Sequence, residues 1–499
     1  MTSVIAFPFG QARTRYTVRL TLPVLAGLIV ALALIPEAIA FSLIAGVDPQ
    51  VGLFAAATMA MSIAFLGGRP AMISAATAAT ALVVAPLMAS HGLDYLIAAV
   101  ILAGVFQVIL GVLGVGKLMR FIPRSVMIGF VNALGILIFT SQLPDLIGVP
   151  WLVYPLTALG LAIIYLLPRI TTVVPAPLVS IIVVTALAVV FALNVPTVGD
   201  KGELPDALPT LFLPNVPFTL ETFQVIAPYA LGMAAVGLLE SLMTAKLVDD
   251  ITDTRSNKVR ESWGQGAANI ISGFFGGMGG CAMVGQTMIN VKASGARTRI
   301  STFLAGAFVL VLAVSLGEVV ALIPMAALVA VMIFVSIATF DWHSIRPSTL
   351  RMMPKSETIV MAVTVIGTVA THNLAIGVGL GVLTAMVLFA RRVAHFATVT
   401  RTLTSEAEGE EATARYTVDG ELFWASSNDL YTQFEYAEDP QHIVIDLTTS
   451  HLWDASTIAA LDSVEDKYRH YGKHVEVIGL NQASQAMRTR MSGRLGSGH

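Results

Sequence analysis

The sequence predicts an α-helical polytopic membrane protein that carries a water-soluble α/β domain at its C-terminus. Of the 499 residues, 56% are hydrophobic and only 12% are charged, whereas a soluble domain carries about 25% charged residues. Residues 401–499 hold 16 of the 32 acidic residues and 8 of the 29 basic ones. This shift in charge predicts a cytoplasmic N-terminal segment at 1–17, a transmembrane domain at 18–392, a linker at 393–411 and a soluble domain at 412–499.

The membrane domain is predicted to hold fourteen transmembrane segments. A full span needs about 20 mostly apolar residues, and the third and tenth segments are shorter than that. The predicted segments cover residues 18–36, 50–66, 74–90, 93–114, 124–142, 151–168, 175–194, 222–248, 260–277, 285–293, 299–317, 321–340, 357–372 and 374–391.

The distribution of basic residues predicts the orientation in the membrane. With the N-terminus in the cytoplasm, 20 of the 21 Lys and Arg residues before position 401 fall on the cytoplasmic side, and only Lys201 falls on the other. Cytoplasmic loops carry such an excess of basic residues. Both termini are therefore expected in the cytoplasm, with the chain in the inner (plasma) membrane. The charged run from Asp249 to Arg260 is expected to form a solvated cytoplasmic loop.

Two halves of seven segments resemble each other. Segments 1 and 8 carry the carboxylates Glu37 and Glu240, each followed by a full helix and then by a broken one. The breaks are the glycine-rich stretches 67–70 and 276–280. Because seven is odd, the halves must insert with opposite orientations, which predicts an inverted repeat. Paired interrupted helices in such repeats indicate a transporter binding site at the middle of the membrane.

The two short helices are predicted to form an anion site. A half-helix that starts inside the membrane presents unpaired backbone N–H groups and the positive end of its dipole. Two such ends facing each other bind an anion without Lys or Arg, and Ser74, Thr77, Gln286 and Thr287 could add donors. The alternative is that the small residues here only permit tight helix packing.

Several stretches of the sequence resemble a known family of transporters. Residues 36–54 fit the signature of the SulP (sulfate permease) anion transporters, which runs Pro-Gln-x-x-Ala-Tyr/Phe-Ser/Ala-x-x-Ala-Gly-x-x-Pro-x-x-Gly-Leu-Tyr/Phe. The runs 240–242 and 265–277 also resemble family segments. In the tail, predicted strands at 443–447 and 474–480 and a helix opening at 451–457 are similar to a STAS domain, the regulatory module at the C-terminus of these transporters.

The resemblance implies a fold, a mechanism and a set of site residues. The fold would have a core domain (helices 1–4 and 8–11) and a gate domain (helices 5–7 and 12–14), forming a homodimer that works by an elevator-like movement. The residues implied to line the substrate site are Glu37, Phe41, Ser74, Ala75, Ala76, Thr77, Gly285, Gln286 and Thr287. Most members have Gln at the position of Glu37, and some have Ser-Arg where Gly285 and Gln286 stand. A site with an added carboxylate and no arginine is less favourable for a dianion.

Glu240 is the candidate for carrying the coupling cation. It lies inside a long apolar helix, where burial favours the protonated form of a carboxylic acid. We expect it to carry a proton, or a sodium ion with help from Thr244 one turn on, because some family members place a sodium site here. The alternative is a structural carboxylate capped by backbone or hydroxyl groups.

The leading hypothesis is a secondary active transporter of a small anion, of the dicarboxylate, bicarbonate or sulfate class, by proton-coupled symport. The alternatives are an anion exchanger, a sodium-coupled bicarbonate transporter, and a membrane-tethered STAS signalling protein with a cytoplasmic protein partner. The sequence contains no Walker motif, so it does not support ATP-driven pumping. We also expect no enzyme activity, cofactor, metal site or nucleic-acid partner. Ser456 is a candidate phosphorylation site, although hydroxyls at a helix start are often only caps.

Overall fold

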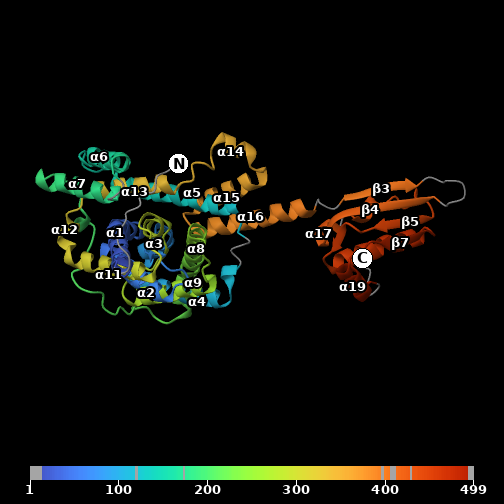
Figure 1. Cartoon of the computed structure of the whole chain (residues 1–499), viewed down its shortest axis with the longest axis horizontal. Coiled ribbons are helices and arrows are strands. Elements are labelled where there is room, and N and C mark those ends of the chain that lie inside the picture. Colours follow the sequence, from blue (N-terminus) through green and yellow to red (C-terminus); the bar gives the residue numbers. More distant parts are fainter. Residues whose placement is uncertain are drawn as a thin grey trace. The chain divides into compact units, whose positions relative to one another are not determined.

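The computed structural model describes residues 14–117, 122–171, 175–394, 398–404, 412–427 and 430–492. The chain divides into two compact units, Met1–Val382 and Leu383–His499. The division falls within the helix α16, Leu374–Ala394. The first unit is helical and the second contains a mixed sheet (Figure 1).

Each of the fourteen predicted segments contains a helix. The first half of the helical unit consists of α1 (Thr14–Ala45), α2 (Pro49–Leu66), β1 (Ser74–Ala75), α3 (Ala78–His91), α4 (Leu93–Val112), α5 (Arg124–Ser141), α6 (Val153–Leu166) and α7 (Ala176–Val190). The second half consists of α8 (Leu220–Thr252), α9 (Lys258–Phe274), β2 (Cys281–Ala282), α10 (Val284–Met288), α11 (Arg299–Ser315), α12 (Gly317–Ala321), α13 (Met325–Thr339), α14 (Pro347–Met352), α15 (Lys355–Thr371) and α16. Among the described residues, the helices α1, α2, α4, α5, α8 and α16 are long and apolar enough to cross a membrane. Fourteen crossings remain a prediction.

Two of the predicted segment boundaries that differ from the structure matter for the candidate site. Helix α1 does not end at residue 36 but continues past Pro36 to Ala45, so Glu37 lies inside a helix. The third segment does not begin at Ser74: residues 74–75 form β1, and helix α3 begins at Ala78. A two-residue strand carries too little sequence pattern to be recognised, because alternation needs at least four residues to be visible.

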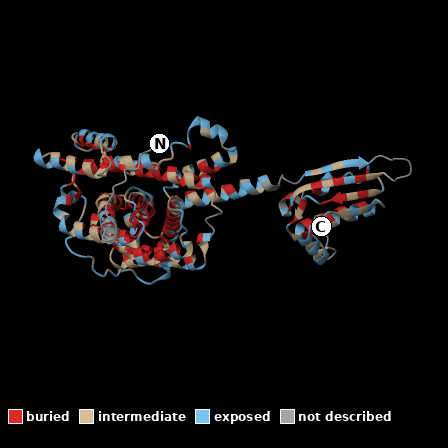
Figure 2. Ribbon diagram, viewed as in Figure 1, coloured by how far each residue is buried: buried red, intermediate tan, exposed pale blue. Residues whose placement is uncertain are grey.

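The helices of the first unit pack in two groups. Helix α4 packs on α8 and α9, and α2 packs on α1, α9 and α11, whereas α5 packs on α13 and α15, and α6 on α7 and α13. Figure 1 shows the α5, α6, α7, α13 and α15 group as a layer above the others. The helices α4 and α9 approach closely at Gly104 and Gly266, where a Cβ on either residue would lie within 2.6 Å of the other's carbonyl oxygen. Buried residues are concentrated where the helices face one another (Figure 2).

The loops of the first unit contact one another in two separate sets. In one set, Lys201 forms an ion pair with Asp145 at 2.7 Å, and the backbone N–H of Asn215 donates to Asp94 at 2.9 Å. In the other, Arg69 forms an ion pair with Asp249 at 3.1 Å. Each of these contacts joins loops or helix ends that the basic-residue pattern predicts on the same side of the membrane.

The second unit contains a five-stranded sheet. Its elements are β3 (Thr398–Thr404), β4 (Thr413–Leu422), α17 (Trp424–Ser427), β5 (His442–Asp446), β6 (Ser450–Leu452), α18 (Ala455–His470), β7 (His474–Ile478) and α19 (Gln482–Met491). The strand order is β3-β4-β5-β7, with β6 beside β4; β3 and β4 are antiparallel and the other pairs are parallel. Side chains of β4, β5 and α18 form the core, including Tyr416, Ile445 and Tyr468.

The predicted strands at 443–447 and 474–480 correspond to β5 and β7. The predicted helix start at 451 is wrong, because residues 450–452 form β6 and α18 begins at Ala455. Asp454 sets this start: its carboxylate accepts a hydrogen bond from the backbone N–H of Thr457 at 3.0 Å, the usual arrangement of a helix cap.

Candidate functional site

The two interrupted segments of the halves meet as a pair of short strands. Strand β1 runs antiparallel to β2, with Ser74 opposite Ala282 and Ala75 opposite Cys281. Gly280 precedes β2, and a Cβ at this position would lie 1.8 Å from the carbonyl oxygen of Ala75. Only glycine therefore fits where the two backbones cross, and this crossing places the helices that follow, α3 and α10, next to one site.

Helix α3 begins at this crossing with a side-chain cap. The Thr77 hydroxyl accepts a hydrogen bond from the backbone N–H of Thr80 at 3.3 Å. The first backbone N–H groups of a helix have no partner within it, and the first two residues of α3, Ala78 and Ala79, line a cavity. These donors and the positive end of the helix dipole favour a negative charge at this place.

The cavity has a volume of about 1220 Å³ and lies between the two helix groups. Six of the residues predicted for the substrate and cation sites line it: Glu37, Phe41, Thr77, Glu240, Gly285 and Gln286. Glu37 and Glu240 are the charged side chains of this lining, as far as the described residues show, and most of the others are apolar. The structure thus brings the two predicted carboxylates and the start of α3 to one cavity.

The cavity extends toward the side of the basic loops. Its lining includes Leu25 of α1, Leu247 of α8 and Thr339 of α13, all in the halves of these helices that lead to loops rich in Lys and Arg. At the opposite end, Ile44 of α1 and Met325 of α13 line a void of only about 30 Å³. The large cavity therefore extends toward the side predicted to be cytoplasmic, and the void near the other end of α1 and α13 is small.

Glu240 contacts a residue that sequence reasoning did not select. The thiol of Cys281 donates a hydrogen bond to Glu240 Oε2 at 3.0 Å, and the Thr77 hydroxyl lies 3.2 Å from Cys281 Sγ. These contacts connect α8, β2 and the cap of α3. Cys281 is the only cysteine of the chain and directly follows the second glycine break, which is the one signal that could have indicated it.

Glu37 lies opposite the start of α10. Its carboxyl group has the side chain of Gln286 as a hydrogen-bond partner. Gln286 is almost fully buried, and its Oε1 atom is buried without a hydrogen-bond partner. Phe41 lies one turn further along α1, where it is 3% exposed.

The other predicted residues lie at or next to the place where β1 and β2 cross, and several hold it by hydrogen bonds. Ser74 accepts a hydrogen bond from Gln265 Nε2 at 2.6 Å, and the Thr287 hydroxyl accepts one from the backbone N–H of Ile73 at 3.0 Å. Ala75 and Ala76 are fully buried. The Thr244 hydroxyl donates to the backbone oxygen of Glu240 at 2.8 Å, and its part in holding a sodium ion stays a prediction.

Ser456 in the second unit is exposed at the second position of α18. It is not the cap of that helix, because Asp454 fills this role. Its hydroxyl group is therefore on the surface, and its phosphorylation remains a prediction.

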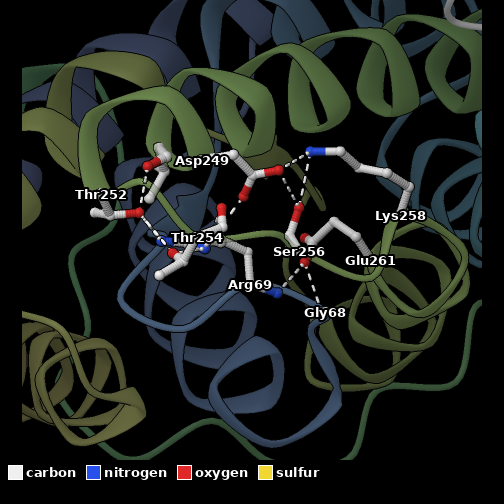
Figure 3. Close-up of polar contacts among 9 residues, drawn as sticks. Gly68, Arg69, Asp249, Thr252, Thr254, Ser256, Lys258 and Glu261 are labelled. Carbon is white, nitrogen blue, oxygen red and sulfur yellow. Dashed lines mark hydrogen bonds and ion pairs between the residues drawn. The ribbon is translucent and has the colours of Figure 1, made fainter.

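A polar cluster around Arg69 anchors the segment that leads into β1 (Figure 3). The Arg69 cluster consists of Gly68, Arg69, Asp249, Thr252, Thr254, Ser256, Lys258 and Glu261. Asp249 forms ion pairs with Arg69 at 3.1 Å and with Lys258 at 2.8 Å. Its side chain is 17% exposed and belongs to helix α8, so the prediction of a solvated loop is wrong for this residue.

Glu261 connects this cluster to the site. Its Oε2 atom accepts hydrogen bonds from the backbone N–H groups of Gly68 at 2.8 Å and Arg69 at 3.0 Å. Its Oε1 atom accepts one from Gln265 at 2.9 Å, and the same amide reaches Ser74 of β1. Since Glu261 is fully buried, it fixes the backbone ahead of β1. The sequence contained no pattern that joins residues so far apart in the chain.

Comparisons with known proteins agree with this architecture. Residues 20–159 and 150–364 match the model of the sulfate permease family, and residues 404–492 match that of the STAS domain. A putative sulfate transporter, YbaR of Bacillus subtilis, is 53% identical over 94% of this chain and 96% of its own. The bicarbonate transporter BicA of a Picosynechococcus species is 30% identical over 74% of this chain and 70% of its own.

Solved structures share the fold. The transmembrane domain of a cyanobacterial bicarbonate transporter, BicA, superposes with a TM-score of 0.64 at 26% identity, covering 72% of this chain and 97% of that one. The murine Solute Carrier 26 family member A9 anion transporter, in an inward-facing state, superposes with a TM-score of 0.80 and covers 94% of this chain and 87% of that one. At 16% identity the latter shows the fold alone.

Proposed function

Because the chain belongs to the sulfate permease family of anion transporters, we propose that it carries a small anion together with a proton across the membrane. The observation that supports this is the composition of the cavity. The α3 N-terminus offers hydrogen-bond donors to an anion. The charged side chains among the described residues that line the cavity are, however, two carboxylates, Glu37 and Glu240.

An anion and an ionised carboxylate in one cavity repel each other. Two unit charges roughly 4 Å apart interact by about 4 kcal/mol at an effective dielectric constant of about 20. Binding of an anion therefore favours protonation of the nearby carboxyl groups, and protonation favours binding of the anion. Two ligands that each raise the other's affinity are carried together when the site moves, which is symport.

The candidate substrates are a dicarboxylate, bicarbonate or sulfate. Relatives are described as sulfate or bicarbonate transporters, and donors at a helix N-terminus recognise all three anions by charge. We favour a carboxylate-type anion or bicarbonate, because the described lining of the cavity offers no cationic side chain to a dianion. Sodium coupling at Glu240 is the alternative, because the Thr244 hydroxyl donates its hydrogen to the backbone oxygen of Glu240 and keeps its own oxygen lone pairs for a cation.

The remaining parts of the proposal concern how the site moves and where the protein resides. The group of α1–α4 and α8–α11 would carry the site as an elevator-like core past a gate made of the other helices. We further propose a homodimer in the inner membrane with both termini in the cytoplasm. The STAS domain at residues 404–492 would act as a regulatory module, with a cytoplasmic protein as its partner.

Uptake into proteoliposomes tests this function. Radiolabelled sulfate, bicarbonate and fumarate would each be offered with an imposed proton gradient, an imposed sodium gradient or neither. We expect accumulation of one anion driven by the proton gradient, and loss of that accumulation in Glu240→Gln. Accumulation driven only by sodium, or only by an anion loaded on the opposite side, would instead establish sodium symport or exchange.

A further inference from the structure

We propose that Cys281 is a positioning residue that reverses a chain of hydrogen bonds when Glu240 takes up a proton, and thereby frees the Thr77 hydroxyl to bind the anion. The inference rests on the proposed function, since it assumes that Glu240 carries the coupling proton. It adds the physical link between the two sites. That link consists of the Glu240 carboxyl, the Cys281 thiol and the Thr77 hydroxyl, with the thiol hydrogen-bonded to each of the other two.

The chain runs in one direction when Glu240 is ionised. A carboxylate only accepts hydrogen bonds, so the Cys281 thiol must donate to Glu240 Oε2, across 3.0 Å. The sulfur then has no hydrogen left to donate toward Thr77. The Thr77 hydroxyl, 3.2 Å from Sγ, must therefore supply the hydrogen of that contact. Its hydrogen is directed at the sulfur and away from the cavity.

A proton on Glu240 reverses both bonds. The carboxylic acid has one O–H donor and donates it to Cys281 Sγ. The thiol hydrogen then turns toward Thr77 Oγ1, which accepts it. The Thr77 hydrogen is released, and the hydroxyl presents it to the cavity that Thr77 lines. No bond other than hydrogen bonds is made or broken, and the added proton stays on Glu240.

The freed hydroxyl lies where an anion would bind. Thr77 caps α3, and the two residues that follow it, Ala78 and Ala79, line the same cavity. Thr77 Oγ1 also lies 3.1 Å from Thr80 Oγ1, but a hydrogen bond to an anion is about twice as strong as one to a neutral oxygen. The anion therefore competes successfully for the released hydrogen. Protonation at α8 in this way adds a donor at the start of α3.

Burial restricts the relay to these groups. Cys281 is fully buried and does not line the cavity, so water does not replace its thiol between Glu240 and Thr77. Among the described titratable groups, Cys281 of β2 contacts Glu240 directly, and Glu37 of α1 faces the same cavity. Glu37 has Gln286 as its partner and takes no part in the chain, although its charge acts on the anion across the cavity.

Substitutions at Cys281 distinguish a role in reversing the hydrogen bonds from a role in packing alone. Serine can both donate and accept at one atom, so Cys281→Ser keeps the reversal, whereas Cys281→Ala removes it. Thr77→Asn gives an independent second test. Asparagine caps helices as well as threonine does, but its amide donates from one atom and accepts at another and cannot reverse.

The measurement is the pH dependence of the apparent KM for uptake, with radiolabelled sulfate, bicarbonate and fumarate as probes, in wild type and the three variants. With one proton linked to anion binding, the wild-type KM should rise up to about tenfold per pH unit. Cys281→Ser should keep the wild-type pH profile. In Cys281→Ala and Thr77→Asn the repulsion between the anion and Glu240 remains but the donor that protonation adds is lost, so the KM should change less between acidic and alkaline pH than in the wild type. A change of KM as large as the wild-type change in both Cys281→Ala and Thr77→Asn would overturn the relay and leave proton symport standing. A wild-type KM that does not depend on pH for any transported probe would overturn the proposed function and the relay together.

Discussion

Two buried regions of the membrane unit use carboxylates in opposite ways. In the Arg69 cluster, both oxygens of Glu261 accept hydrogen bonds from fixed donors, and the residue is fully buried. At the cavity, Glu240 receives one hydrogen bond from a thiol, which is a weak donor, and Glu37 has one amide partner.

The difference separates structural from exchangeable carboxyl groups. Glu261 Oε2 already accepts from two backbone N–H groups, so a proton or a ligand at this oxygen would have to displace one of them. A carboxyl group that faces a cavity with a single neutral partner can do so at little cost. We therefore assign Glu261 to holding the backbone before β1, and Glu37 and Glu240 to transport.

The largest effect is expected for Glu261→Ala. The substitution leaves the backbone N–H groups of Gly68 and Arg69 buried without an acceptor and removes one of the two acceptors of the Gln265 amide. This should lower the free energy of unfolding by about 3 to 5 kcal/mol. Unfolding by SDS in mixed micelles, followed by the loss of helical circular dichroism, measures this. The exposed carboxylate in Asp466→Ala is the control and should cost less than about 1 kcal/mol. A Glu261→Ala variant as stable as this control would show that Glu261 is not a structural carboxylate, and it would then not differ from Glu37 and Glu240 in this respect.

A smaller effect is expected for Asp249→Asn. The amide keeps the size of the side chain and can still accept one hydrogen bond, but it loses the charge that pairs with Arg69 and Lys258. Because Arg69 is 8% exposed, its charge would be poorly compensated, and we expect a loss of about 2 kcal/mol. The same SDS titration measures it. A Lys258→Met variant should cost less, since the Lys258 side chain is 30% exposed.

The composition of the chain was sufficient to predict the membrane unit. A bilayer requires long apolar segments, and that requirement leaves a strong pattern in the sequence, so all fourteen predicted segments contain helices. The strands β1 and β2 were missed because two residues carry no periodic signal. The β3–β4 pair of the second unit was also not predicted, although its alternating side chains extend over several residues.

The candidate site was predictable where its signal is local. The signature at residues 36–54 and the carboxylate in α8 indicated Glu37 and Glu240 directly, and the structure places both at one cavity. Contacts between distant parts of the chain left no such signal. Cys281 is 41 residues from Glu240, and Arg69 is 180 residues from Asp249, so only the folded chain shows that these pairs meet.

A much smaller effect is expected when the cavity carboxylates are neutralised. Glu240→Gln and Glu37→Gln keep the shape of the side chain, and neither removes an acceptor that several buried donors need. We expect each to change the free energy of unfolding by less than about 1 kcal/mol, while Glu240→Gln abolishes proton-driven accumulation. SDS titration and uptake on the same preparations give both values. A loss of stability similar to that of Glu261→Ala would show that Glu240 is structural.

The smallest effect is expected at a third kind of carboxylate, the ion-paired Asp446 at the end of β5. The Arg415 guanidinium and the hydroxyl and backbone N–H of Thr448 bond to Asp446 and lower its pKa to about 2, compared with about 3.9 in an unfolded chain. A lowered pKa stabilises the fold fully above about pH 4, and this stabilisation is lost as the pH falls through about 2.

Pepsin, which is active in this acidic range, can report the loss in the full-length protein. Cleavage within residues 412–492 should accelerate as the pH falls from about 4 to about 2, and Asp446→Asn should flatten this dependence because the amide does not titrate. Asp466→Asn is the matched control, since Asp466 lies on the surface with its side chain 68% exposed. If Asp446→Asn and Asp466→Asn gave the same pH profile as the wild type, the bonds to Asp446 would contribute nothing measurable to stability. The contrast between carboxylates held by fixed donors and exchangeable carboxylates would then apply only to the membrane unit.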